Sequence, residues 1–219
     1  MRKLANFING EYVAPQSDKY FSNYDPSRGE VFSLVPDSDE LDVVMAVRAA
    51  NQAFPVWAET TTSERSQILL RVADLIEKRS EELAQAESQD QGKTYHQAFK
   101  MELPRVVQNF RFFATRILHQ EELATHMDAK ALNYVIRQPL GVAALIVPWN
   151  LPLYLLSWKI APALAMGNTV VAKPSEWTPL TASLLGEIFQ AAQLPSGVCN
   201  IVLGRGESAG AALVQHPGV

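Results

Sequence analysis

Residues 141–147, GVAALIV, are apolar throughout and show no alternation of polar and apolar side chains. Such a run is typical of a parallel strand that is covered on both faces. Two more such strands are expected at residues 169–173, TVVAK, and 198–203, VCNIVL. Helices are expected after each strand: from Pro152 to about Ala165, from Pro179 with Thr178 as its N-cap, and over residues 206–215. This alternation predicts a doubly wound α/β sheet of the nucleotide-binding type.

The chain ahead of this sheet has a different rhythm. A hairpin is expected over residues 7–13, around Asn9-Gly10, and a short strand over 31–35. Helices are expected after Asp39, over residues 63–79, from Ser80 to Gly92, and from Pro104 onward. The first of them is expected to bury one stripe, made of Val43, Val44, Val47, Ala50 and Phe54. Since only three parallel strands are visible, we also expect the last of them to expose an unpaired edge.

Composition limits the class of partner. The chain has 219 residues, of which 47% are hydrophobic and 19% charged, so it can bury a sizeable core. Its net charge of −4 argues against nucleic acid or an anionic membrane as the main partner. No apolar run reaches the roughly 18–20 residues of a membrane span, and the N-terminal residues do not resemble a secretory signal. The single cysteine, Cys199, fits a reducing compartment, so we expect a cytoplasmic protein.

Three short motifs resemble sites of other protein classes. Gly92-Lys93-Thr94 resembles the end of a phosphate-binding loop, but that loop needs a glycine where Glu87 stands, and a helix C-cap is the simpler interpretation. Residues 206–210, GESAG, fit the turn that carries a nucleophilic serine, yet only a histidine and no acid follows Ser208. Gly204-x-Gly206-x-x-Ala209 fits a dinucleotide fingerprint, which is weak alone because a glycine turn that leads into a helix explains it equally well.

Neither a metal site nor a cysteine nucleophile is expected. The four histidines show no ligand spacing and the cysteine has no partner cysteine. Cys199 lies inside an expected strand, where a small buried hydrophobic role is favoured.

Polar residues gather where the three expected parallel strands end, which is where open α/β sheets bind ligands. They are residues 147–150, VPWN, residues 173–176, KPSE, and residues 204–206, GRG. Asn150 offers a neutral amide to a developing oxyanion. Lys173 and Glu176 can donate to and accept from ribose hydroxyls, and Glu176 would repel a 2′-phosphate, which favours NAD over NADP. Gly206 allows close backbone approach to a cofactor.

Each of these residues also has a simpler explanation. Asn150 could cap the helix before Pro152, and Lys173 with Glu176 could be a solvated turn pair. Their occurrence together at one sheet edge favours a site. We therefore expect Asn150, Lys173 and Glu176 to converge around one bound dinucleotide.

The same segments resemble the aldehyde dehydrogenase superfamily. The resemblance lies in VPWNLP at 147–152, WKIAPALA at 158–165, GNT at 167–169 and KPSEWTPL at 173–180, and it extends over nearly the whole chain. Within the superfamily, Leu103-Pro104-Arg105 ahead of NFRFFA at 109–114, and WNLPLY at 149–154, look most like the 2-aminomuconic and 2-hydroxymuconic semialdehyde dehydrogenases. The resemblance implies three regions. Residues 1–120 are helices and edge strands packing on the cofactor domain, 121–140 a bridging, oligomerisation-type strand segment, and 141–219 the first part of a Rossmann-like NAD domain.

The resemblance also implies a role for each site residue. Asn150 would stabilise the oxyanion, and Val147, Pro148 and Trp149 would contact the nicotinamide half of NAD. Lys173 and Glu176 would bind the adenosine ribose, and Gly206 would lie by the adenine. Arg105 would hold the carboxylate of a muconic semialdehyde, because a guanidinium fork suits a carboxylate; a solvated helix arginine is the alternative.

One departure from the family pattern is large. Members of the family are more than twice as long as this chain. They carry a cysteine nucleophile and a glutamate base in a later catalytic domain. Neither Cys199 nor any other residue of this chain matches the nucleophile or the base. We therefore expect the N-terminal fragment of an NAD-dependent aldehyde dehydrogenase that is inactive alone, with a muconic semialdehyde as the full-length substrate and a homo-oligomer as the full-length form. The alternatives are a non-catalytic nucleotide-binding or subunit-assembly module, and a hydrolase built on Ser208, which fails on residue order.

Overall fold

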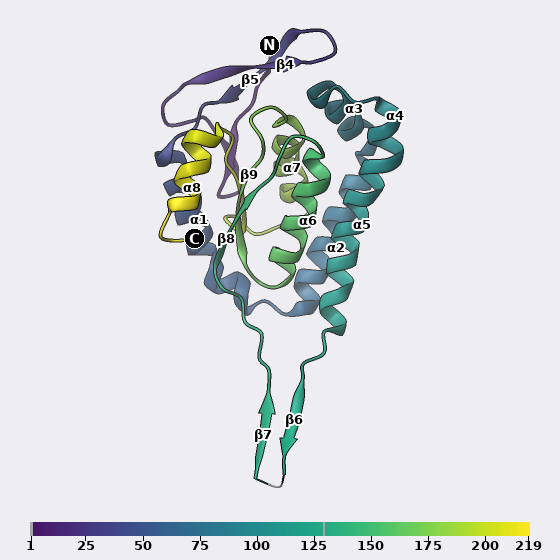
Figure 1. Ribbon diagram of the computed structural model, residues 1–219, viewed down its shortest axis with the longest axis vertical. Coiled ribbons are helices and arrows are strands. Elements are labelled where there is room, and N and C mark those ends of the chain that lie inside the picture. The colour runs from purple at the N-terminus through teal and green to yellow at the C-terminus, as the bar shows by residue number, and fades with distance from the viewer. Residues whose placement is uncertain (1, 129) are drawn as a thin grey trace.

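The computed structural model describes residues 2–128 and 130–219 and is built around one five-stranded sheet in the order β3-β2-β10-β9-β8 (Figure 1). Three of its strands, β8 (Val142–Ile146), β9 (Thr169–Lys173) and β10 (Cys199–Ile201), run parallel. The predicted α/β fold with an incomplete parallel sheet is confirmed. The same-direction strands place residues 147–150, 173–176 and 204–206 at one edge of the sheet.

The expected open edge on the last parallel strand is not there. Strand β2 (Asn6–Ile8) lies antiparallel on β10, and β3 (Glu11–Val13) continues from it through the predicted turn. Asn9 and Gly10 both have positive φ angles, 54° and 82°, as a tight hairpin turn requires. The N-terminal hairpin therefore covers the edge that the sequence pattern left open. This removes the argument for an assembly module that rested on it.

Burial separates β8 from the other two parallel strands, since β10 is buried throughout. All five residues of β9 are buried, as predicted for a strand covered on both faces. Strand β8 is largely half-buried, so the same prediction for residues 142–146 is wrong. The reason is position: β8 ends the sheet, with β9 as its neighbour among the described residues.

Helices cover the two faces of the sheet. One face carries α1 (Glu40–Glu59) and α8 (Ala211–Gln215), and the other carries α6 (Pro152–Ala165) and α7 (Leu180–Ala191) (Figure 1). Behind α6 and α7 lie α2 (Thr62–Lys78) and α5 (Leu103–Arg116). The alternation of side chains along β9 divides the core accordingly: Val171 packs in the α1 cluster, and Val170 and Ala172 pack in the larger cluster on the other face.

The helix boundaries follow local capping chemistry. Asp39 and Asp42 form a reciprocal capping box on α1, and Thr61 and Glu64 form one on α2. Helix α3 (Ser80–Gln91) ends at Gly92, whose φ of 80° is the left-handed conformation expected of a C-cap glycine.

Two helix expectations need correction. In α1, Val44 is 41% exposed and Phe54 only half-buried, while Ala46 and Trp57, which the predicted stripe did not include, are buried. Pro104 lies in the first turn of α5, as predicted, but the chain ahead of it is not a loop. The chain is already helical from α4 (Tyr95–Gln97) through a π-helical turn at Ala98–Glu102, so Pro104 lies at the start of α5 within a longer helical run.

Two smaller sheets flank the body. Strands β1 (Arg2–Lys3), β5 (Glu30–Pro36) and β4 (Tyr20–Asp25) form one, of which only β5 was expected from the sequence. Strands β6 (Ala124–Met127) and β7 (Ala131–Tyr134) form a hairpin that projects away from the body (Figure 1). Within the described part of the chain, no helix has both the length and the apolar character that crossing a membrane requires.

The contact between the N-terminal hairpin and α7 gives a testable prediction. A Cβ atom on Gly186 would lie 2.5 Å from the Tyr12 hydroxyl and 2.6 Å from Cδ2 of Phe7. Gly186→Ala should therefore lower the free energy of unfolding by about 1–3 kcal/mol, measured by urea denaturation. Helix propensity alone would raise it by roughly 0.5–1 kcal/mol, so the sign separates the two effects. Gly210→Ala is the control, since its Cβ would meet other atoms only at 3.7 Å or beyond.

Candidate functional site

Three of the predicted residues are in contact at the carboxyl ends of β9 and β10. Lys173, the last residue of β9, is 2% exposed, and its Nζ lies 3.1 Å from Oε2 of Glu176. The other oxygen of Glu176 accepts a hydrogen bond from the backbone N–H of Gly206, with a donor–acceptor distance of 3.3 Å. A cation, a carboxylate and a backbone N–H are therefore assembled at one point.

The charge of Glu176 is stabilised by these neighbours. Partial burial alone would raise the pKa of this carboxyl. Hydrogen bonds from its own backbone N–H, from Lys173 and from Gly206 outweigh burial and hold the pKa below its ordinary value. Glu176 is thus a carboxylate at neutral pH, which can accept hydrogen bonds and would repel a phosphate.

The loop after β8 carries the other predicted residues. Val147 is buried and bonds through its N–H to the Lys173 carbonyl at 3.3 Å, which ties this loop to the end of β9. Trp149 is 57% exposed and Asn150 is exposed as well. The Asn150 side chain forms no hydrogen bond within residues 2–128 and 130–219, so it does not cap α6, and it makes no direct bond to Lys173 or Glu176.

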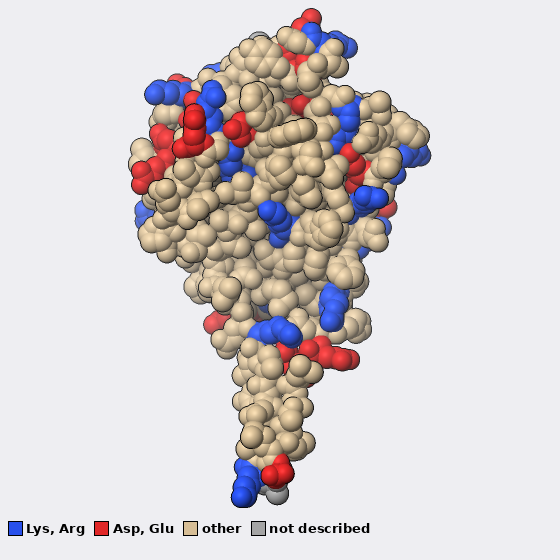
Figure 2. Space-filling model, viewed as in Figure 1, with Lys and Arg blue, Asp and Glu red and all other residues tan. Residues whose placement is uncertain are grey.

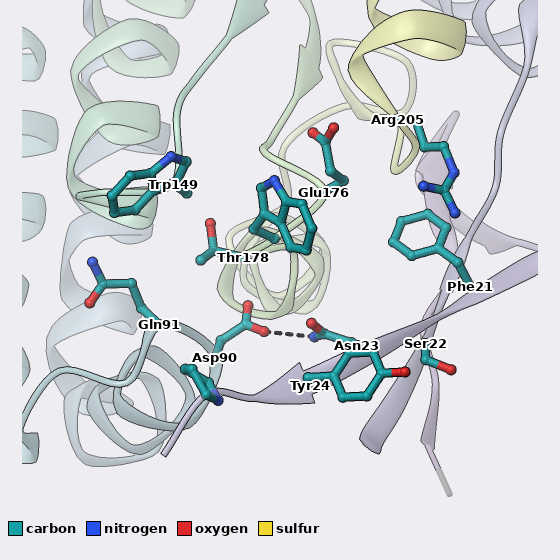
Figure 3. A pocket seen from close by; sticks show the side chains of 12 residues that line it. Phe21, Ser22, Asn23, Tyr24, Asp90, Gln91, Trp149, Glu176, Thr178 and Arg205 are labelled. Atoms are coloured by element: carbon teal, nitrogen blue, oxygen red, sulfur yellow. Dashed lines mark hydrogen bonds between the residues drawn. The ribbon is translucent and has the colours of Figure 1, made fainter. Parts of the chain in front are cut away.

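A hollow of about 780 Å³ is lined by at least one residue from the end of each parallel strand (Figure 3). Trp149 follows β8, Glu176 and Trp177 follow β9, and Arg205 follows β10. This volume is in the range of small-molecule sites, and aromatic walls with a few polar groups are typical of them. Five predicted residues are not among its lining residues: Asn150, Val147, Pro148, Lys173 and Gly206. Trp149, Glu176 and Arg205, which lie next to or near them in the chain, do line it.

Strand β4 supplies the opposite wall, and sequence analysis did not find it. Phe21, Asn23 and Tyr24 line the hollow, and the Arg205 guanidinium lies 4.6 Å from the Phe21 ring centroid and 3.3 Å from an Asp37 oxygen. The only sequence signal was the aromatic content of residues 20–24 ahead of the turn that begins at Asp25.

Helix α3 holds the two loops through buried carboxylates. Oε1 of Glu87, a residue 1% exposed, accepts hydrogen bonds from the Leu153 N–H at 2.9 Å and from the Thr181 hydroxyl at 3.1 Å. Asp90, one turn further, accepts from the Leu180 N–H at 2.7 Å and from the Asn23 side-chain amide at 2.6 Å. The starts of α6 and α7 are therefore capped by another helix.

This arrangement corrects one prediction. Thr178 is not the N-cap of α7; Pro179 occupies that position and the capping carboxylate comes from Asp90. The Thr178 hydroxyl is buried without a hydrogen-bond partner among the described residues.

The buried carboxyls have perturbed acidity. Burial raises the pKa of Asp90 to about 7, although the hydrogen bonds from Leu180 and Asn23 oppose it. Burial also raises the pKa of Glu87, and Lys93, whose Nζ lies 3.8 Å from Oε2 of Glu87, opposes that shift. Lys93 also pairs with the buried Glu102.

Two of the three alternative motifs, Gly92-Lys93-Thr94 and the turn at Ser208, have structural roles. Lys93 is buried against carboxylates rather than free to meet a phosphate, and Gly92 is a helix C-cap. The Ser208 hydroxyl donates to the Ser38 carbonyl at 3.2 Å. Cys199 is 1% exposed and burial raises the pKa of its thiol, as expected of a core residue. The described residues contain no group of three or more potential metal-ligating side chains.

Arg105 lies apart from the hollow. It is exposed on α5, with its guanidinium carbon 5.8 Å from the ring centroid of Tyr154 on α6. Its assignment to a substrate carboxylate stays a prediction.

Comparison with known proteins identifies the family. A family model described as the aldehyde dehydrogenase family matches residues 12–219. The human 2-aminomuconic semialdehyde dehydrogenase is 54% identical over 217 residues, which are 99% of this chain and 44% of that protein. The 2-hydroxymuconic semialdehyde dehydrogenase of Pseudomonas sp. strain CF600 is 45% identical over 225 residues, 100% of this chain and 46% of that protein. The chain spans less than half the length of these relatives.

Comparison with solved structures identifies the same family. An aldehyde dehydrogenase from Bacillus cereus in complex with NAD+ superposes with a TM-score of 0.97 at 40% identity, over 100% of this chain and 45% of that one.

The acidity of Asp90 gives a prediction for pH-dependent stability. A carboxyl with a pKa of about 7 in the folded state and 3.8 as its ordinary value binds its proton more tightly when folded. Its contribution to stability is complete below about pH 4 and is lost as pH rises to about 7. The Asp90→Asn variant has no ionisable group here, so it does not lose this stability as pH rises. Its amide can keep the bond to Asn23 if the Asn23 side-chain amide flips and accepts instead of donating. Between pH 5 and 7 the free energy of unfolding of the wild type should fall relative to the variant by about 1 kcal/mol per pH unit.

The measurement is urea denaturation at several pH values, with Asp18→Asn, an exposed position, as the control that should follow the wild type. Parallel pH profiles for wild type and Asp90→Asn would contradict a strongly raised pKa.

Proposed function

The chain belongs to the aldehyde dehydrogenase family, and we propose that it is the N-terminal part of an NAD-dependent enzyme that oxidises an aldehyde to a carboxylic acid. The observation that carries the proposal is the contact of Lys173, Glu176 and Gly206 beside a hollow that reaches all three parallel strand ends. Ligands of open α/β sheets bind at this edge.

The residues at the strand ends fit NAD. The Glu176 carboxylate, bound to Lys173 and Gly206, stays partly exposed, so it has capacity left to accept hydrogen bonds from the adenosine ribose. Lys173 donates to the same hydroxyls, and Gly206 leaves room for the adenine side. A 2′-phosphate would meet the Glu176 charge, which disfavours NADP. When bound here, NAD would supply the hydride acceptor that oxidation of an aldehyde to an acid requires.

The loop after β8 would serve the reacting end. Val147, Pro148 and Trp149 would border the nicotinamide half, with the indole of Trp149 as a wall. The Asn150 amide, which has no hydrogen-bond partner within the described residues, is available to donate to an oxyanion that develops on the aldehyde.

We propose that this 219-residue chain alone does not turn over aldehydes. Covalent aldehyde oxidation requires a thiolate that attacks the carbonyl carbon. The one cysteine in the sequence is Cys199, which is buried in the core with a raised thiol pKa, so it supplies no accessible thiolate.

For the substrate, we propose an aldehyde that also bears a carboxylate, of the muconic semialdehyde class. Two kinds of relative carry that substrate in their names. Arg105 is exposed and lies over Tyr154 of α6, the helix that begins just after Asn150. A guanidinium fork in that place suits a carboxylate remote from the reacting carbon.

We propose that the whole protein is a homo-oligomer and that the β6–β7 hairpin contacts a second copy. All residues of both strands that the structure describes are exposed, and Leu132, Tyr134 and Ile136 are each more than half exposed. Figure 2 shows the projecting hairpin as mostly uncharged, with charged side chains at its tip and base. Exposed apolar area of this kind marks interaction sites. Residues 121–140 would then bridge subunits, while 1–120 and 141–219 form the body.

The cofactor proposal is tested by calorimetric titration of NAD into the chain. Glu176→Gln should weaken NAD binding by about tenfold, the loss typical of a hydrogen bond to a charged group, and should narrow the preference over NADP. Glu59→Gln, an exposed glutamate at the end of α1, is the control. No NADH should form when an aldehyde is added. Absence of NAD binding by the wild type, or equal affinity in Glu176→Gln, would refute the cofactor assignment.

The hairpin proposal is tested by sedimentation. The wild-type chain should associate as its concentration rises, and Leu132→Lys should remain monomeric. Val214→Lys, at an exposed apolar position on α8, should associate like the wild type. If wild type and Leu132→Lys had equal sedimentation masses at every concentration, the hairpin would be excluded as the contact between two copies of the chain.

A further inference from the structure

The last turns of α3 contact both loops of the proposed cofactor site. The two loops are residues 147–151, after β8, and residues 174–179, after β9. Gln91 donates to the Asn150 carbonyl in the first loop. Glu87 accepts from the Leu153 N–H just after that loop, and Asp90 accepts from the Leu180 N–H just after the second. In Figure 3, Asp90 and Gln91 lie on the same side of the hollow, with Gln91 below Trp149 and Asp90 below Thr178. One helix thus reaches both segments that would hold a dinucleotide.

The loop of residues 147–151 is tied to β9 at its start by the Val147 N–H, but the described residues show no hydrogen bond between two residues of the loop itself. Leu151 is the N-cap of α6 and has no side-chain acceptor, and Pro152 has no N–H. The first free N–H of the helix, on Leu153, binds Glu87. The carbonyl of Asn150 accepts from Nε2 of Gln91 at 2.9 Å. Two side chains of α3 therefore fix the loop on either side of Leu151.

The loop of residues 174–179 is held differently. It has turns of its own, in which the Trp177 N–H binds the Ser175 hydroxyl and the Thr178 N–H binds the Ser175 carbonyl, both at 3.3 Å. Its end is fixed by the bond from the Leu180 N–H to Asp90. Gln91 makes no hydrogen bond to this loop within residues 2–128 and 130–219.

We propose that Gln91 is a positioning residue that fixes the loop of residues 147–151, and with it Trp149 and Asn150, independently of the loop that carries Glu176. The proposal rests on the proposed NAD site, because it assigns the 147–151 loop to the nicotinamide half and the 174–179 loop to the adenosine half. Loss of the Gln91 bond would then affect recognition of one half of the dinucleotide only.

The binding test compares NAD with ADP, which lacks the nicotinamide half. Gln91→Met keeps the length of the side chain and removes the amide donor. The Kd for NAD should rise by about three- to tenfold, the range expected for one neutral hydrogen bond, while the Kd for ADP changes less than about twofold. Gln89→Met is the matched control, since Gln89 is an exposed residue of the same helix, and it should change neither Kd. An equal loss of NAD and ADP affinity, or no loss, would overturn the proposal.

A second measurement needs no nucleotide. In the free chain, hydrogen exchange of the Leu153 amide, which donates to the Glu87 side chain in the wild type, should be faster in Gln91→Met than in the wild type or Gln89→Met, because release of the loop at Asn150 loosens the start of α6. Exchange over residues 174–180 should be unchanged, and thermal unfolding verifies that the variant is folded. If the wild type binds no NAD, the proposed function fails, and this readout still decides whether Gln91 fixes the loop. Unchanged exchange of the Leu153 amide refutes the positioning role.

Discussion

The geometry of the strand ends depends on two buried carboxyls of one helix. Glu87 and Asp90, one turn apart on α3, accept hydrogen bonds from the first free N–H groups of α6 and α7. Neither α6 nor α7 has a side-chain cap of its own. Burial of a charged carboxylate costs free energy, and for this reason the pKa values of both carboxyls are raised. Since the Asn150 and Glu176 loops lead directly into these helices, α3 sets where the two candidate cofactor contacts lie.

The N-terminal strands belong to the same unit. Strand β2 pairs with β10, and the Asn6 side chain accepts a hydrogen bond from the Leu203 N–H at 2.8 Å. Asn6 also donates to Ser38 at 2.8 Å, just ahead of α1. On the other strand, the Asn200 side chain accepts from the Asn9 N–H at 2.9 Å. Buried amide groups thus join the first residues of the chain to the last parallel strand, where a hydrophobic contact alone would leave the register open.

Local signals were sufficient for much of this fold. The unbroken apolar runs located the three parallel strands, Asn9-Gly10 the hairpin turn, and Gly92 the end of α3. Their order placed Lys173, Glu176 and Gly206 at one edge, where the structure joins them. Contacts between segments that are far apart in the sequence could not be predicted from local sequence patterns. The cap of α7 comes from Asp90 rather than from the adjacent Thr178, strand β2 covers β10, and the wall made by β4 lies some 125 or more residues ahead of Trp149 in the sequence. Half-burial of β8 likewise follows from its place in the sheet and not from its composition.

One dinucleotide should bind across the carboxyl ends of β8, β9 and β10. In a crystal structure of the chain grown with NAD, we expect ribose hydroxyls within hydrogen-bond distance of the Glu176 carboxylate and Lys173, with the nicotinamide half against the loop of residues 147–151. A nucleotide bound elsewhere, or one that leaves the Lys173–Glu176 pair untouched, would contradict it.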